Sequence, residues 1–135
     1  MTIDVGVKKL ELGDKKIIFL DSPGHRDFIP NMITGAAQAD YAILVIDTDN
    51  FESSFIGGGQ TKEHAYIVKS FGVHKLIVAM NKMDRIGWDP EKFAHIRQRL
   101  GTYLIKIGFK PESIIFAPIS ALNGVNITKK NMIKF

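Results

Sequence analysis

The chain has 135 residues, of which 45% are hydrophobic and 24% charged, a composition that suits a single folded domain with its own core. A net charge of +4 permits a nucleic-acid or ribosomal partner without requiring one. The absence of cysteine excludes disulfides and thiolate metal sites, and no apolar stretch reaches the roughly eighteen residues of a membrane span, so we expect a cytoplasmic protein without membrane contact.

The N-terminal part predicts a β-hairpin followed by a helix. Residues 2–12 alternate in polarity, which is typical of a strand with one covered face. Gly13-Asp14 interrupts this pattern, and the apolar run 17–20 follows as the second strand of the hairpin. The apolar spacing within residues 28–39 predicts a short helix.

Three further apolar runs predict strands of a mostly parallel sheet. They cover residues 41–46, 76–80 and 113–118. The first run is apolar without alternation, as expected of a strand covered by helices on both faces.

Two helices are predicted between these strands. Residues 61–71 have helical periodicity, with Thr61 as the N-cap and Gly72 as the terminator. Asp89 and Pro90 begin a helix that runs to residue 107, and residues 48–60 are predicted to be an exposed loop. Strands that alternate with helices predict an α/β fold.

Polar residues gather in three loops that follow predicted strands, where ligands bind in open α/β sheets. In the second loop, Asp84 can accept two N–H groups from the Watson–Crick edge of guanine, whereas adenine presents an acceptor there. The stem of Lys82 can cover the base and Asn81 can brace the loop. In the third loop, Ser120-Ala121-Leu122, a backbone N–H of Ser120 or Ala121 can reach the guanine carbonyl.

The first loop suits the phosphate end of a nucleotide. Asp21 can hold Mg²⁺ through water, because Mg²⁺ prefers few carboxylates together with phosphate oxygens. Gly24 lets its N–H approach a terminal phosphate, and His25 can position the attacking water. Each motif alone is weak evidence, but the three in this order favour a GTP site.

The sequence closely resembles the GTP-binding domain of translational GTPases in the elongation factor 1-alpha branch. The branch includes elongation factor 1-alpha, the release-factor GTPase and the ribosome-rescue GTPase that partners Pelota. The matching segments are residues 2–5, 21–28, 31–33, 38–40, 59–61, 63–65, 81–84 and Ser120. Pro30 and the run 35–40 resemble the rescue and release-factor members more than elongation factor 1-alpha, and we favour the rescue type.

The resemblance implies a P-loop GTPase-like, three-layer α/β domain that binds GTP or GDP with Mg²⁺. By position, Thr2 and Asp21 would contact Mg²⁺, Gly24 the γ-phosphate, and His25 would activate hydrolysis on the ribosome. The guanine site would comprise Asn81, Lys82, Asp84, Ser120, Ala121 and Leu122. The implied partners are the ribosome and a Pelota-like or release-factor-like protein or aminoacyl-tRNA. We expect a monomeric protein that does not bind specific DNA sequences.

The family's phosphate loop, Gly-x-x-x-x-Gly-Lys-Ser/Thr, does not occur in these 135 residues. We therefore expect residues 1–127 to be a partial GTP-binding domain without its first strand, phosphate loop and first helix, and residues 128–135 to be a disordered tail. The strands ending at Leu20 and Ile46 would then lack the strand between them, so weak or no GTP binding and marginal stability are expected. The alternative is a non-catalytic paralogue that only binds partners.

Overall fold

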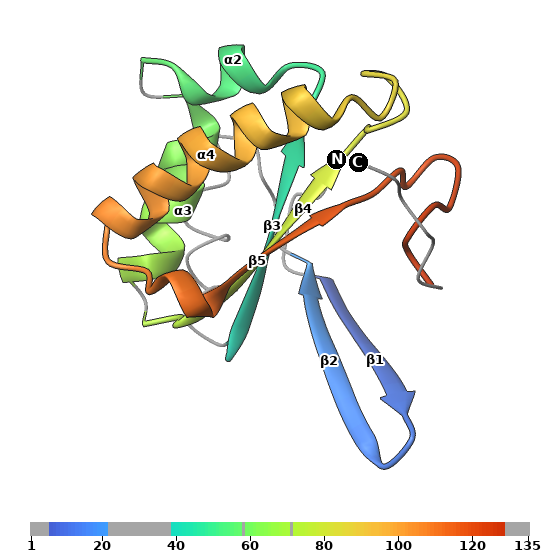
Figure 1. Ribbon diagram of the computed structural model, residues 1–135. Helices are drawn as coiled ribbons and strands as arrows, with labels where there is room; N and C mark the ends of the chain where they lie inside the picture. The colour runs from blue at the N-terminus through green and yellow to red at the C-terminus, as the bar shows by residue number, and fades with distance from the viewer. Residues whose placement is uncertain (1–5, 22–38, 58, 71, 129–135) are drawn as a thin grey trace.

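The computed structural model describes residues 6–21, 39–57, 59–70 and 72–128. The described strands form two separate sheets, an antiparallel hairpin and a parallel sheet (Figure 1). The α/β fold class is confirmed. The helix expected over residues 28–39 lies outside the described residues except for its last residue, and so does the start of the strand expected from residue 2.

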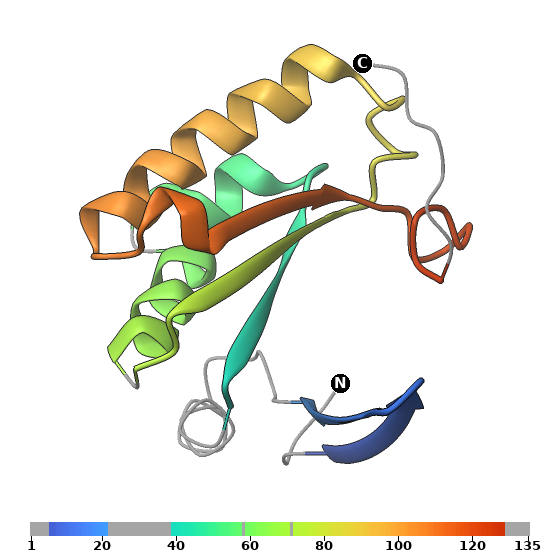
Figure 2. The ribbon, with the colours of Figure 1, turned by 60° about the horizontal axis from the view of Figure 1, so that its bottom comes forward.

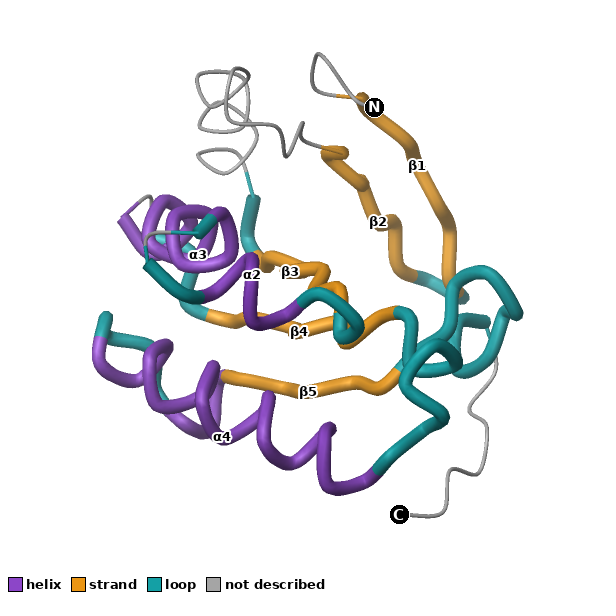
Figure 3. Tube along the Cα trace, turned by 90° about the horizontal axis from the view of Figure 1, so that it is seen from above, coloured by secondary structure: helices purple, strands orange, loops and turns teal. Residues whose placement is uncertain are grey.

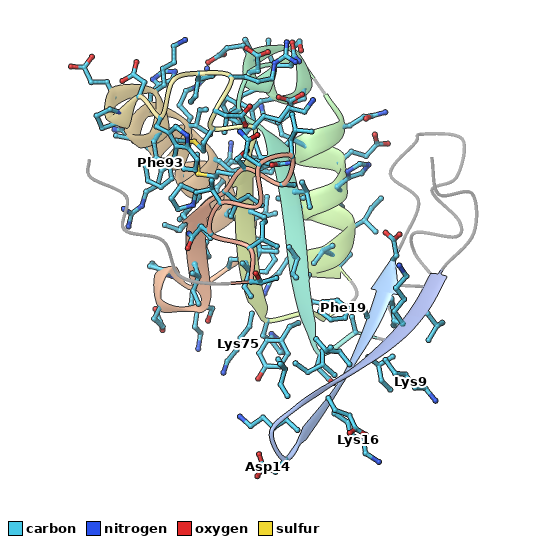
Figure 4. The ribbon with its side chains drawn as sticks, turned by 90° about the vertical axis from the view of Figure 1, so that its right-hand side faces the viewer. Lys9, Asp14, Lys16, Phe19, Lys75 and Phe93 are labelled. Carbon is cyan, nitrogen blue, oxygen red and sulfur yellow. The ribbon has the colours of Figure 1, made fainter. Side chains whose placement is uncertain are left out.

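The hairpin consists of β1 (Gly6–Leu12) and β2 (Lys15–Asp21), joined at Gly13, whose φ of +62° suits glycine. This part of the prediction is confirmed. The expectation of a covered face is wrong, because all seven residues of β1 are exposed. Among the described strands, β1 and β2 pair only with each other, and the side chains of Lys9 and Lys16 extend into the surrounding space (Figure 4).

The parallel sheet has the order β3-β4-β5, formed by β3 (Tyr41–Asp47), β4 (Lys75–Asn81) and β5 (Ile114–Pro118). All three strands match the predicted runs to within a residue or two. Within the described residues, β2 and β3 belong to different sheets and do not pair with each other.

The described helices all lie on one face of this sheet (Figure 2). The other face exposes Tyr41, Ile43 and Val45 at 59%, 52% and 63%, so the expectation that helices cover both faces of β3 is not met within the described residues. The reason is topological. Right-handed crossovers from β3 to β4 and from β4 to β5 progress in the same direction, which places both connecting helices on the same face.

The longest helix, α4 (Pro90–Lys106), supplies much of the core. The side chain of Asp89 accepts a hydrogen bond from the Glu91 N–H, and Pro90 occupies the first helical turn, as predicted. Helical spacing places Phe93, Ile96, Leu100 and Leu104 on the face that packs against the sheet. Seen from above, α4 runs beside β5, whereas α2 and α3 lie nearer β3 (Figure 3).

The segment predicted to be a loop contains a short helix, α2 (Phe51–Phe55), and this prediction is wrong. Phe51 and Phe55 are 2% and 5% exposed, and their rings stack with centroids 4.8 Å apart. Their i, i+4 spacing was the available signal. The intervening serines and the glycines at 57–59 are typical of a loop, so the local sequence does not favour a helix here. The helix is stabilised by the burial of both rings in the core.

Helix α3 (Gln60–Ser70) connects α2 to β4. It begins one residue earlier than predicted, so Thr61 lies within the first turn and is not the N-cap. The Thr61 hydroxyl instead donates to Ser54 Oγ at 3.1 Å, which ties α3 to α2. Gly72 follows the helix with φ of +83°, in agreement with its predicted role as terminator. None of the helices in the described residues has the length and apolar character needed to cross a membrane.

An exposed charge cluster joins α2 to α4. Glu52 accepts hydrogen bonds from Arg99 Nη1 and, at 3.2 Å, from His95 Nε2. The Arg99 hydrogen bond is the main reason why the pKa of Glu52 lies below its ordinary value of 4.5, and the contact with His95 adds to it.

This cluster predicts a pH-dependent contribution to stability. Because the folded-state pKa of Glu52 is depressed, the carboxylate stabilises the fold above pH 4.5, and this contribution is lost as the pH falls through the folded-state pKa. The melting temperature of Glu52→Gln should therefore be slightly lower than that of the parent at pH 7, and the two melting temperatures should coincide in acid. Glu112→Gln removes the same charge from an exposed position away from α2 and serves as the control. A difference that persists unchanged in acid would contradict the role of the Glu52 charge.

Candidate functional site

Two of the three polar loops predicted from the sequence, 81–84 and 120–122, meet at one edge of the parallel sheet. The arrowheads of β3, β4 and β5 point to this edge (Figure 1). The parallel register places Asp47 opposite Asn81 and Met80 opposite Pro118. The residues that follow these strand ends therefore come together in space.

Asp84 and Ser120 form a direct contact at this edge. The hydroxyl of Ser120, a fully buried side chain, donates to Asp84 Oδ1 at 2.7 Å. Ser120 also pairs with Val125 through reciprocal backbone hydrogen bonds of 3.1 and 3.0 Å, which close the loop that carries it. The orientation of the Asp84 carboxylate is thus fixed by a buried donor on a different loop.

Asn81 joins the same two loops through its side chain. Its Oδ1 accepts the Ala121 N–H at 2.9 Å, in line with the bracing role expected from the sequence. The backbone N–H groups of Ser120 and Ala121, which were expected to reach a guanine carbonyl, are both engaged within the protein. The Ser120 N–H bonds to Val125 O, and the Ala121 N–H bonds to Asn81. An Ala121 contact with a ligand therefore requires a shared hydrogen bond or a movement of Asn81.

Lys82 is restrained at both ends of its side chain. Its backbone has φ of +64°, an uncommon conformation for a residue with a Cβ, and the next residue, Met83, is fully buried with its N–H bonded to Ile119 O at 3.2 Å. The ammonium group lies 2.8 Å from Asp47 Oδ2. Asp47 was not among the site residues predicted from the sequence, although it follows the run 41–46 directly, as Asn81 follows the run 76–80.

Asp47 is held as a carboxylate by its surroundings. Partial burial is the largest influence on its pKa and raises it, but hydrogen bonds from Lys82 and Asn50 together outweigh burial and lower the pKa below 3.8. The Lys82–Asp47 contact is therefore an ion pair at neutral pH.

The loops 81–84 and 120–122 expose Lys82, Ala121 and Leu122 at this edge of the sheet. Two hollows of about 450 and 400 Å³ lie along α4, and their linings include none of the residues 81–84 or 120–122. Leu122 is 89% exposed.

The residues expected at the phosphate end are only partly described. Asp21 is the exposed last residue of β2, and Thr2, Gly24 and His25 lie outside the described residues. In the described ranges, no group of three or more His, Asp or Glu side chains is arranged to hold a metal ion. Asp21 provides one hard oxygen donor, which fits a cation such as Mg²⁺ that keeps several waters.

The chain matches a known protein family and is similar to two curated proteins. The family described as the elongation factor Tu GTP binding domain matches residues 1–134. Protein HBS1 of Drosophila melanogaster is 49% identical over 132 residues, which is 96% of this chain and 20% of that protein. The elongation factor 1 alpha-like protein of Schizosaccharomyces pombe is 44% identical over 135 residues, which is 97% of this chain and 23% of that protein.

A similar fold occurs in a solved structure. The bacterial selenocysteine-specific elongation factor EF-Sec superposes with a TM-score of 0.77 at 31% identity, covering 93% of this chain and 20% of that chain. This chain thus spans about a fifth of the length of these three proteins.

Proposed function

Because this chain belongs to the family of elongation factor Tu GTP-binding domains, we propose that its loops 81–84 and 120–122 bind the guanine base within a GTP-hydrolysing translation factor. The single observation that carries the proposal is the Ser120–Asp84 hydrogen bond, which holds a carboxylate at the strand edge in a fixed orientation. That carboxylate can accept the N1–H and the 2-amino group of guanine, and adenine offers neither. Asn81 Nδ2 remains a donor suited to the N7 acceptor of guanine.

We assign the phosphate end to Thr2, Asp21, Gly24 and His25. Asp21 and Thr2 would hold Mg²⁺, which when bound neutralises phosphate charge. The Gly24 N–H would donate to the γ-phosphate, and His25 would orient the attacking water. These roles rest on the resemblance, and only Asp21 lies within the described residues.

The similarity to known relatives supports a wider role. The proposal is a cytoplasmic, monomeric factor that acts on the ribosome, with ribosome rescue favoured over release or elongation because of the similarity to protein HBS1. A Pelota-like partner fits this role best, and a release-factor-like protein or aminoacyl-tRNA are the alternatives. Since the chain spans a fifth of that relative, partner binding and hydrolysis by the whole protein are part of the proposal.

The test is a nuclear magnetic resonance titration of the ¹⁵N-labelled chain with GDP, with ADP as the matched control. GDP should shift the amide signals of Ala121 and Leu122 and the side-chain amide of Asn81, with a dissociation constant of about a millimolar. Such weak binding is expected because no phosphate loop is present in this sequence. Equal shifts with ADP, or no shifts at these positions, would contradict the proposed guanine site.

A further inference from the structure

We propose that Asp47 is a positioning residue of the guanine site, whose carboxylate anchors the Lys82 ammonium so that the aliphatic stem of Lys82 lies across the base. The inference rests on the proposed function. It begins from the ion pair of 2.8 Å between two residues 35 positions apart, which joins the end of β3 to the guanine loop.

The backbone of Lys82 makes this anchoring effective. Its left-handed conformation is fixed by neighbouring hydrogen bonds, including Arg85 N–H to Lys82 O at 3.0 Å. With the backbone fixed and the ammonium held by Asp47, the four-carbon stem between them has few conformations left. A stem that is ordered before the ligand arrives loses less entropy on covering a base.

The remaining contacts of Asp47 show what a substitution must preserve. Its Oδ1 accepts the backbone N–H groups of Asp49 and Asn50 at 3.0 and 3.3 Å, and its Oδ2 accepts Asn50 Nδ2 at 3.1 Å in addition to Lys82. Asp47 therefore shapes the turn that leads into α2 as well as holding the lysine. Asparagine keeps an Oδ1 for the two turn amides, but it places an NH₂ group opposite the ammonium.

The exposure of the pair sets the size of the effect. The side chains of Lys82 and Asp47 are 46% and 29% exposed, so water and salt weaken the attraction. For a pair of this exposure, loss of the anchor should weaken GDP binding by about two- to fivefold.

The experiment is a double-mutant cycle in the 135-residue chain with GDP titrations followed by amide shifts. Asp47→Asn should weaken GDP binding about two- to fivefold, while Lys82→Met removes the ammonium but keeps an apolar stem. In the Lys82→Met background, Asp47→Asn should have no further effect, because the group that it acts through is gone. Asp49→Asn breaks the neighbouring pair with Arg85, at 3.0 Å, and should leave GDP binding unchanged.

A second readout does not depend on nucleotide. Carbon-13 titration of the Asp47 carboxyl group should give a higher pKa in Lys82→Met than in the parent, since the lysine hydrogen bond lowers that pKa. An unchanged Asp47 pKa would show that the Lys82 ammonium does not contact the Asp47 carboxylate in solution, and the proposal would fail.

The outcomes separate the inference from the function on which it rests. If the parent binds GDP but Asp47→Asn has no effect, or the same effect in both backgrounds, the positioning role is overturned and the guanine site stands. If the parent shows no guanine-selective shifts, the proposed function fails and the positioning role fails with it.

Discussion

Replacing Asp84 with asparagine should transfer base preference from guanine to xanthine. The carboxylate offers two acceptors to the guanine N1–H and 2-amino group, whereas an asparagine amide offers one acceptor and one donor. Xanthine keeps the N1–H but has a carbonyl at position 2, so it matches the amide. We expect GDP affinity to fall by about 10²- to 10⁴-fold, beyond detection in this chain, and xanthosine diphosphate to shift the Ala121 amide in its place.

The design keeps the protein scaffold intact. Asparagine at position 84 retains an Oδ1 that can accept the Ser120 hydroxyl, which now bonds to Asp84 Oδ1 at 2.7 Å. Asp49→Asn makes the same change of charge in the adjacent turn and should keep guanine preference. A variant that folds but keeps its preference for GDP over xanthosine diphosphate would show that Asp84 does not contact the base.

Replacing Phe51 with alanine should produce the largest loss of stability among the substitutions considered. Phe51 is 2% exposed and stacks on Phe55, which in turn makes an edge contact with Tyr103 on α4 at 6.0 Å. Removing a buried phenylalanine costs about 3–5 kcal/mol. Because domains of this size are stable by about 5–15 kcal/mol, the variant should lose a large share of its stability in urea unfolding followed by circular dichroism.

The matched control is Tyr66→Ala on α3. Tyr66 is an aromatic residue of similar size that is 60% exposed, so its loss should change the free energy of unfolding by no more than about 0.5 kcal/mol. A cost below about 1 kcal/mol for Phe51→Ala would mean that α2 does not pack into the core in solution.

The candidate site was largely predictable from local sequence. The segments Asn81–Asp84 and Ser120–Ala121 follow strands that the sequence marks clearly, and parallel strands must end at a common edge. Asp47 was missed because a single carboxylate after a strand has no motif around it, and its partner lies 35 residues away. Only the register between β3 and β4 brings that partner within 2.8 Å.

The sequence by itself determined the elements whose signals are local: the Gly13 turn, the three apolar strands, the capped helix α4 and the loops that end β4 and β5. Periodicity, caps and turn residues act over a few positions, so they can be recognised without the fold. Tertiary structure alone decided the short helix α2, the single covered face of the sheet and the Asp47–Lys82 pair. Each of these depends on which distant residues become neighbours, and burial and pairing across long separations are fixed only when the strands take their order in the sheet.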